Sequence, residues 1–149
     1  MPGKPVLSVP PLVQQPAARE KVQSTFETRF TIDHEWVRLS GGVATIGITD
    51  YAQQALGEIV YVDLPPTGRT IEIGEPCAVV ESIKAASDIQ APLNGTVTDR
   101  NDALVDDPAL VNRAPQERGW FFKLKLSSTA EFASLMDAAA YQALVDSLV

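Results

Sequence analysis

The chain contains very few of the residues that build disulfides and metal sites. Among its 149 residues there is one cysteine, Cys77, and one histidine, His34. A single cysteine excludes an intrachain disulfide, and one cysteine with one histidine offers no zinc-ligand spacing. We expect Cys77, which adjoins the apolar residues 78–80, to be a buried strand residue and not a nucleophile.

Long apolar runs and an excess of positive charge are also missing. No stretch approaches the roughly eighteen consecutive apolar residues of a membrane-spanning helix, so we expect a soluble, intracellular protein without a membrane partner. The 12 lysine and arginine residues face 19 aspartate and glutamate residues, which gives a net charge of −7. An acidic protein repels phosphate groups, so nucleic acid is not an expected partner, whereas basic proteins are.

The first 25 residues differ in composition from the rest. Five of the 11 prolines lie within the first 16 residues, and proline is incompatible with a regular helix or an internal strand. We therefore expect residues 1–25 to be a disordered or targeting extension and residues 26–149 to form one domain. The extension is poor in acidic residues, as mitochondrial transit peptides are, but it is also poor in arginine. We therefore leave two locations open, the mitochondrial matrix and the bacterial cytoplasm. A third interpretation of the extension is a non-native leader.

From Phe30 onward, short apolar stretches alternate with turn residues. We expect strands over residues 31–39, 43–48, 58–64, 70–73, 78–83, 95–99 and 120–126. A short helix is expected to begin at Asp50, with Gln53 in a capping box, and to end at Gly57, and a helical turn is expected over residues 108–111. Many short strands joined by tight turns favour a mainly β fold, a sandwich or a barrel.

The C-terminal segment is expected to be helical. Ser128 and Glu131 have capping-box spacing, and Asp137 can cap a second helix. An apolar stripe with a spacing of three and four residues follows, formed by Tyr141, Leu144, Val145 and Leu148. Such stripes usually pack on their own domain, so we predict that this one packs against the β structure rather than binding a partner.

Lys84 is predicted to lie at the tip of a tight hairpin. The apolar residues 78–80 precede it, and a second apolar stretch, residues 89–93, follows before the turn pair Asn94 and Gly95. The segment between the two stretches lacks the glycine or proline of a long loop. We therefore expect Lys84 to be presented to solvent.

Three interpretations compete for Lys84. Most lysines are simply solvated surface residues. A catalytic amine would need a lowered pKa, whereas the anionic neighbours Glu81 and Asp88 favour the charged ammonium. The third interpretation is an acylation site, which the small neighbours Ala85 and Ala86 would leave open to a modifying enzyme.

Blocks along the chain, from Arg29 to the C-terminus, resemble the glycine cleavage system H protein family. The run around the lysine resembles the family's lipoylation site, and the other blocks agree in order and spacing. The blocks are Glu81-Ser82-Ile83-Lys84-Ala85-Ala86-Ser87-Asp88-Ile89 with Pro92 and Gly95, Asp33-His34-Glu35-Trp36, Ile46 to Gln53, Leu56 to Val60, Leu110-Val111-Asn112 and Gly119-Trp120.

This resemblance implies a fold and a function. The implied fold is the barrel-sandwich hybrid of lipoyl and biotinyl domains, extended here by short helices and a C-terminal helical segment. The implied function is that of a non-catalytic carrier with lipoic acid in amide linkage. It would take an aminomethyl group from glycine decarboxylase to a tetrahydrofolate-dependent aminomethyltransferase, and dihydrolipoamide dehydrogenase would reoxidise it. A lipoate-attaching enzyme is the fourth implied partner.

The resemblance also assigns site residues. It makes Lys84 the lipoyl attachment point, with Glu81, Ser82, Ala85 and Asp88 as the context of the modification site. It places the surface on which the loaded arm rests near Asp33, His34 and Glu35, where a carboxylate would favour the cationic aminomethyl end. On physical grounds alone, His34 is a packing or hydrogen-bonding residue beside Trp36.

Rival functions remain to be distinguished. A biotin carrier shares the fold, but its lysine is typically flanked by methionines, whereas Ile83 and Ala85 flank Lys84. The lipoyl domain of a 2-oxo acid dehydrogenase would usually be followed by further domains. A protein that relays lipoate to other proteins and an enzyme with a Schiff-base lysine are further alternatives.

The sequence departs from the family pattern at one place. Segment 115–118 lacks the aromatic residue that the family usually has there.

Overall fold

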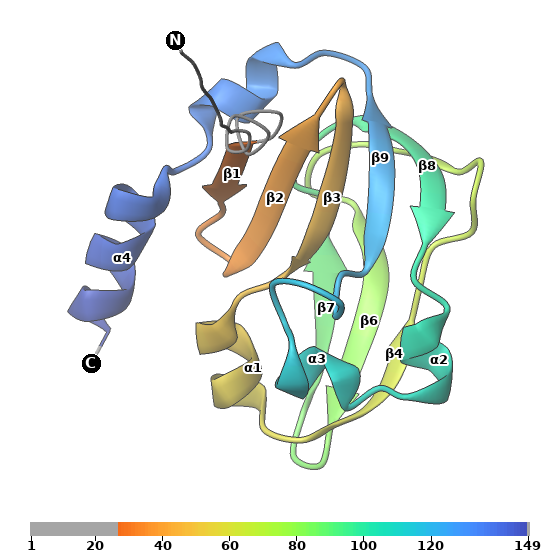
Figure 1. Cartoon of the computed structure of the whole chain (residues 1–149), viewed down its shortest axis with the longest axis vertical. Helices are drawn as coiled ribbons and strands as arrows, with labels where there is room; N and C mark the ends of the chain where they lie inside the picture. The colour runs from red at the N-terminus through yellow and green to blue at the C-terminus, as the bar shows by residue number, and fades with distance from the viewer. Residues whose placement is uncertain (1–26, 149) are drawn as a thin grey trace, which may run out of the picture.

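The computed structural model describes residues 27–148, so the prediction for residues 1–25 lies outside the described residues. The domain is a sandwich of two antiparallel sheets (Figure 1). The larger sheet has the order β1-β2-β3-β9-β8-β5 and the smaller one β4-β6-β7. The strands are β1 (Glu27–Phe30), β2 (Glu35–Ser40), β3 (Val43–Ile48), β4 (Ile59–Asp63), β5 (Thr70–Ile71), β6 (Pro76–Ser82), β7 (Ala86–Gln90), β8 (Gly95–Arg100) and β9 (Phe122–Leu126).

Alternating side chains of the strands build the core of the domain. In β9, Phe122, Leu124 and Leu126 are buried and Lys125 is exposed, as the sequence predicted. They join one apolar cluster with residues of both sheets, including Ile46. Within residues 27–148 no strand pairing joins the two sheets, so the mainly β prediction is confirmed as a sandwich and not as a closed barrel.

The predicted first strand, residues 31–39, is wrong in its first half. A turn over residues 31–34 separates β1 from β2, with the His34 amide donating to the Thr31 carbonyl at 3.1 Å. The Thr31 hydroxyl accepts from the amides of Asp33 and Glu35, both at 3.2 Å. This side-chain-to-backbone bonding competes with the strand ladder and stabilises the turn, in which His34 has a φ of 68°.

The short helices α1 (Asp50–Leu56), α2 (Ala103–Asp106) and α3 (Leu110–Arg113) gather at one end of the sandwich (Figure 1). The cap of α1 is Thr49 and not Asp50, because the Thr49 hydroxyl accepts from the Ala52 amide at 3.2 Å. Gly57 ends α1 as predicted. The predicted helical turn at residues 108–111 begins two residues later, and α2 lies in a segment for which no helix was predicted.

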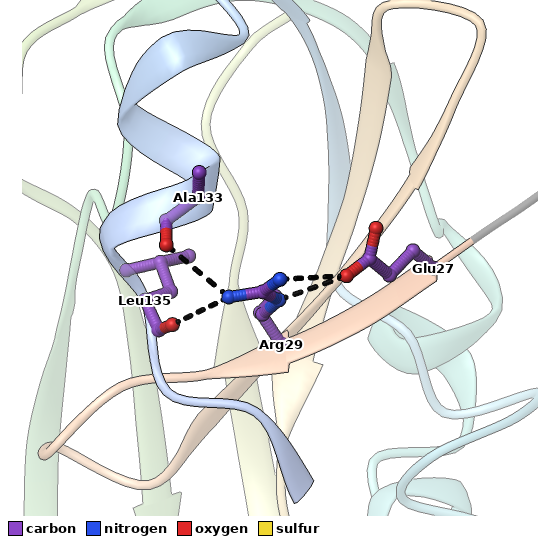
Figure 2. A network of polar contacts seen from close by, with 4 residues as sticks. All are labelled: Glu27, Arg29, Ala133 and Leu135. Atoms are coloured by element: carbon purple, nitrogen blue, oxygen red, sulfur yellow. Dashed lines mark hydrogen bonds and ion pairs between the residues drawn. The ribbon is translucent and has the colours of Figure 1, made fainter.

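The C-terminal segment returns to the edge of the larger sheet. A 3-10 helix (Ala130–Ser134) follows Ser128, whose hydroxyl accepts from the Ala130 amide at 3.2 Å, so the predicted cap is present. The Glu131 carboxylate instead accepts from Asn94 Nδ2 at 2.8 Å. Figure 2 shows how Arg29 of β1 fastens this segment: its guanidinium donates to the carbonyls of Ala133 and Leu135 at 3.2 and 3.1 Å and to the Glu27 carboxylate.

Helix α4 (Ala138–Ser147) lies beyond β1 at the edge of the domain (Figure 1). Asp137 caps it as predicted, accepting from the Ala140 amide at 2.8 Å. Tyr141 is buried and its ring stacks on Phe30 with 4.7 Å between centroids. Leu144 and Val145 pack on the same cluster, whereas Leu148 is 49% exposed, so the predicted stripe packs on its own domain except at its end. No helix within residues 27–148 is long and apolar enough to cross a membrane.

Gly47 allows β2 and β3 to pair around a fully buried tryptophan. It lies opposite Trp36, and a Cβ at position 47 would lie 2.7 Å from Trp36 ring atoms. The ring cannot withdraw easily, because Trp36 Nε1 donates to the Pro115 carbonyl at 2.9 Å. We therefore expect Gly47→Ala to lower the free energy of unfolding by about 1–3 kcal/mol in denaturant titrations. Thr45→Ala on the same strand is the control, and equal stability of the two variants would contradict this view of the packing.

Candidate functional site

The β6–β7 hairpin projects at the same end of the sandwich as α1 and α3 (Figure 1). Three residues, Ile83, Lys84 and Ala85, connect its strands, and Ile83 is 70% exposed. The Ser82 hydroxyl accepts from the amides of Lys84 and Ala85 at 3.2 and 3.1 Å and donates to the Ala85 carbonyl at 3.2 Å. The Ser82 amide donates to the same carbonyl at 2.7 Å. The predicted hairpin is therefore present, and Ser82 orders its tip.

Lys84 is exposed in this connection. None of the ion pairs recorded among residues 27–148 involves its ammonium. Its Cε lies 3.7 Å from the position that a Cβ would take on Gly57, so the side chain runs beside the end of α1. Glu81 and Asp88 are exposed on the two flanking strands. The amine is thus accessible to a modifying enzyme, on an ordered and otherwise acidic hairpin.

Removing the Ser82 hydroxyl should loosen the tip of the hairpin. We expect Ser82→Ala to raise the hydrogen-exchange rates of the Lys84 and Ala85 amides by about tenfold, since each loses a hydrogen-bond partner. The matched control is Ser87→Ala in β7, because the Ser87 hydroxyl makes no recorded hydrogen bond within the described part of the chain. Nuclear magnetic resonance of the labelled protein resolves single amides, and unchanged rates at both positions would refute the ordering role of Ser82.

A cavity of about 190 Å³ lies between the 31–34 turn, α1 and β7. Its wall combines apolar side chains with carboxylates and other polar groups. The lining residues are Asp33, Glu35, Ile48, Ala52, Leu56, Ser87, Asp88, Ile89 and Gln90. Strand β7 therefore links the cavity to the hairpin, since it begins two residues after Lys84 and supplies four lining residues. An aliphatic chain with a cationic end matches such a mixed lining.

Glu35 is the buried acid of this cavity, with 3% of its surface exposed. Burial, and after it the negative charge of Asp33, raises the pKa of Glu35 to about 7. The Thr31 hydroxyl, which donates to Glu35 Oε1 at 3.3 Å, and the Gln90 backbone oppose that rise. Glu35 is therefore poised to change charge near neutral pH. A cation in the cavity would favour the carboxylate and lower its pKa.

The structure separates His34 from its two acidic neighbours. Asp33 and Glu35 line the cavity, whereas His34 Nδ1 lies 2.8 Å from the Tyr141 hydroxyl, which also contacts the Thr49 hydroxyl at 2.7 Å. The imidazole also packs against the ring of Tyr51. This arrangement matches the packing and hydrogen-bonding role that physical reasoning favoured for His34.

Two features of the site were not found from the sequence. The Thr31 hydroxyl bonds both the amide and the carboxylate of Glu35, although nothing in the local sequence pattern marked Thr31 as a turn residue. Residues 87–90 form a wall of the cavity, which the apolar and polar alternation beyond Lys84 could have indicated. A local sequence pattern does not show which distant residues will contact a given side chain.

Cys77 is not a second reactive centre. It is buried, its thiol donates to the Ile89 carbonyl at 3.3 Å, and burial raises its pKa to about 12. The prediction of a buried strand cysteine is confirmed. Segment 115–118, where the sequence departs from the family pattern, also has a structural role. The Pro115 and Gln116 carbonyls accept hydrogen bonds from the side chains of Trp36 and Arg38.

Comparison with known proteins agrees with this architecture. The family described as "Glycine cleavage H-protein" matches residues 28–148. The chain is 58% identical over 122 residues to the "Glycine cleavage system H protein" of Acidiphilium cryptum, which covers 82% of this chain and 98% of that protein. The protein of the same name from Escherichia coli is 50% identical over 121 residues, covering 80% and 94%.

A solved structure shows the same fold. The crystal structure of a glycine cleavage system H protein from Mycobacterium marinum superimposes with a TM-score of 0.71 at 36% identity, covering 78% of this chain and 94% of that chain. These relatives are bacterial, and they give no support to the predicted alternative of a mitochondrial location with a transit peptide. The chain belongs to the glycine cleavage H-protein family, a family of lipoyl carriers in glycine cleavage.

Proposed function

We propose that Lys84 is the lipoyl attachment residue and that the protein shuttles an aminomethyl group between the enzymes of glycine cleavage. The observation that carries the proposal is the placement of Lys84, exposed, without a recorded ion pair in the described chain, on a hairpin tip ordered by Ser82. A disordered lysine would offer no defined substrate to an attaching enzyme, and a buried one would be out of its reach. Glu81, Ala85 and Asp88 complete the surface that this enzyme would contact.

The residues of the cavity fit the group that family membership implies. The lipoyl group, once in amide linkage to Lys84, supplies a reducible disulfide and a thiol that carries the one-carbon amine. The chain itself supplies apolar contacts from Leu56 and Ile89 and an acidic end from Asp33 and Glu35. We propose this cavity as the surface where the loaded arm rests. His34 would act there only indirectly, through the 31–34 turn, which contains Asp33 and leads into Glu35.

Three enzymes would use the protein in turn. Glycine decarboxylase loads the carrier, a tetrahydrofolate-dependent aminomethyltransferase unloads it, and dihydrolipoamide dehydrogenase reoxidises it with NAD. The carrier itself contributes position and not catalysis, because a tether raises the effective concentration of its cargo at each partner. The acidic surface, with a net charge of −7, suits basic docking sites on these enzymes. We place the protein in a bacterial cytoplasm, in keeping with its bacterial relatives, and assign the carrier domain to residues 26–149.

Loading of the unmodified protein with lipoate and a lipoate-attaching enzyme tests the proposal. Intact mass should rise by one lipoyl group, and peptide mapping should place the group on Lys84 alone. Lys123 and Lys125 on β9 serve as internal controls, because they belong to the same molecule but lie outside the hairpin. Modification of either of them instead of Lys84, or acceptance of biotin from a biotin ligase in place of lipoate, would reject the assignment.

A further inference from the structure

Asn112 of α3 holds the connection between α1 and β4. Its Nδ2 donates to the Gly57 carbonyl and to Gln53 Oε1, both at 2.9 Å, and its Oδ1 accepts from the Ile59 amide at 2.9 Å. The side chain thus uses both of its donor hydrogens and its acceptor. It binds the backbone on either side of Glu58, the one residue between Gly57 and Ile59.

The same connection supports the hairpin that presents Lys84. The Ile83 amide donates to the Glu58 carbonyl at 3.0 Å, and Ser82 pairs with Ile59 at the end of the β4–β6 ladder. The Lys84 side chain runs beside Gly57. Residues 57–59 are therefore a brace with one side bound to Asn112 and the other side bound to the residue before Lys84.

The hydrogen bonds from Asn112 are needed to fix the backbone of this brace. Gly57 has a φ of 85°, in the region that only glycine enters freely, so the chain can pivot there at little cost. The pairing register of β4 with β6 also shifts between Ile59 and Tyr61, which interrupts the ladder just beyond the brace. Without Asn112, Gly57 would keep only the bond from its amide to the Gln53 carbonyl at 2.9 Å and Ile59 only its pairing with Ser82, so the Glu58 carbonyl between them would be held less firmly.

We propose that Asn112 is a positioning residue for the modification of Lys84. It fixes residues 57–59, which fix Ile83 and so hold the lysine in the orientation that an attaching enzyme must meet. Asn112 would act through the backbone, without touching the lysine or the group attached to it. The inference rests on the proposed function of Lys84, but the brace itself is a property of the unmodified protein and is measured separately.

The test compares Asn112→Ala with Asn101→Ala. Asn101 is a matched control, since its Nδ2 also donates to two acceptors, the Arg118 and Trp120 carbonyls at 2.8 and 2.7 Å, away from the hairpin. In the unmodified protein, Asn112→Ala should raise the exchange rate of the Ile83 amide about tenfold relative to the Val80 amide, because the brace loses its hydrogen bonds. The kcat/KM of lipoate attachment should fall by a similar factor. Asn101→Ala should change neither quantity.

A second variant keeps the test decisive if the alanine protein folds poorly. Asn112→Asp retains an acceptor for the Ile59 amide but loses both donations, so it should also raise the exchange rate of Ile83. Unchanged Ile83 exchange in both Asn112 variants would overturn the brace. Faster exchange with an unchanged kcat/KM for attachment would overturn the positioning role. If the unsubstituted protein accepts no lipoyl group at Lys84, the proposed function fails, whereas the exchange rates of the unmodified protein still decide whether the brace exists.

Discussion

Lys84→Arg should abolish glycine-dependent NADH formation in a reconstituted glycine cleavage system. Arginine keeps the positive charge and most of the length of the side chain, but its guanidinium remains protonated and is not acylated like an amine. The hairpin should keep its structure, because Ser82 bonds only the backbone of residue 84. Activity should therefore fall to the level of an assay without the carrier, with no change in the free energy of unfolding beyond about 0.5 kcal/mol.

Lys125→Arg is the matched control for this substitution. Lys125 is also exposed, but it lies in β9 of the larger sheet, away from the hairpin. Its variant should support full NADH formation and carry one lipoyl group. Substantial activity of the Lys84→Arg protein would contradict the assignment of the attachment site. This holds even if the wild-type protein carries a lipoyl mass.

Glu35→Gln should remove most of a pH dependence of stability that Glu35 creates. In the unfolded chain the carboxyl ionises near 4.5, whereas burial and Asp33 raise its pKa in the folded protein to about 7. Between these values the folded protein binds the extra proton, so the free energy of unfolding falls as the pH rises from about 4.5 to 7. The loss amounts to about 3 kcal/mol and is complete above the folded pKa. Below pH 4.5 both states are protonated and Glu35 makes no such contribution.

Denaturant titrations between pH 4 and pH 8 measure this effect as a difference between proteins. Relative to the wild type, Glu35→Gln should gain stability as the pH rises, and Glu117→Gln, at an exposed position, is the control for the removal of a carboxylate elsewhere. A constant offset for Glu35→Gln would show that Glu35 ionises normally in the folded protein. The cavity would then hold a full negative charge at neutral pH without a bound cation.

The lysine hairpin was predictable because its information is local. Two apolar stretches flank a short polar segment, and this pattern alone places Lys84 at a turn. The burial of Cys77 and the cap at Asp137 followed from equally local signals. The identity of the group proposed for Lys84 came from the resemblance and not from the chemistry of its neighbours.

One missed feature is local: the turn at residues 31–34 interrupts a sequence that is compatible with a strand, because the Thr31 hydroxyl accepts from the amides of Asp33 and Glu35. The other missed features depend on distant contacts. The raised pKa of Glu35 arises because β7 and α1 close over it, which no local pattern reports. Asn112 acts across 53 positions of sequence on the Ile59 amide, so its role became visible only in the folded chain.

The most direct test of the account is the intact mass of the protein from its native host, before and after incubation with glycine and glycine decarboxylase. The account predicts one lipoyl group, mapped to Lys84, and a further gain of one aminomethyl group that depends on both glycine and the decarboxylase. A biotin mass on Lys84, or a lipoyl group there that the decarboxylase cannot load, would contradict the assignment to glycine cleavage.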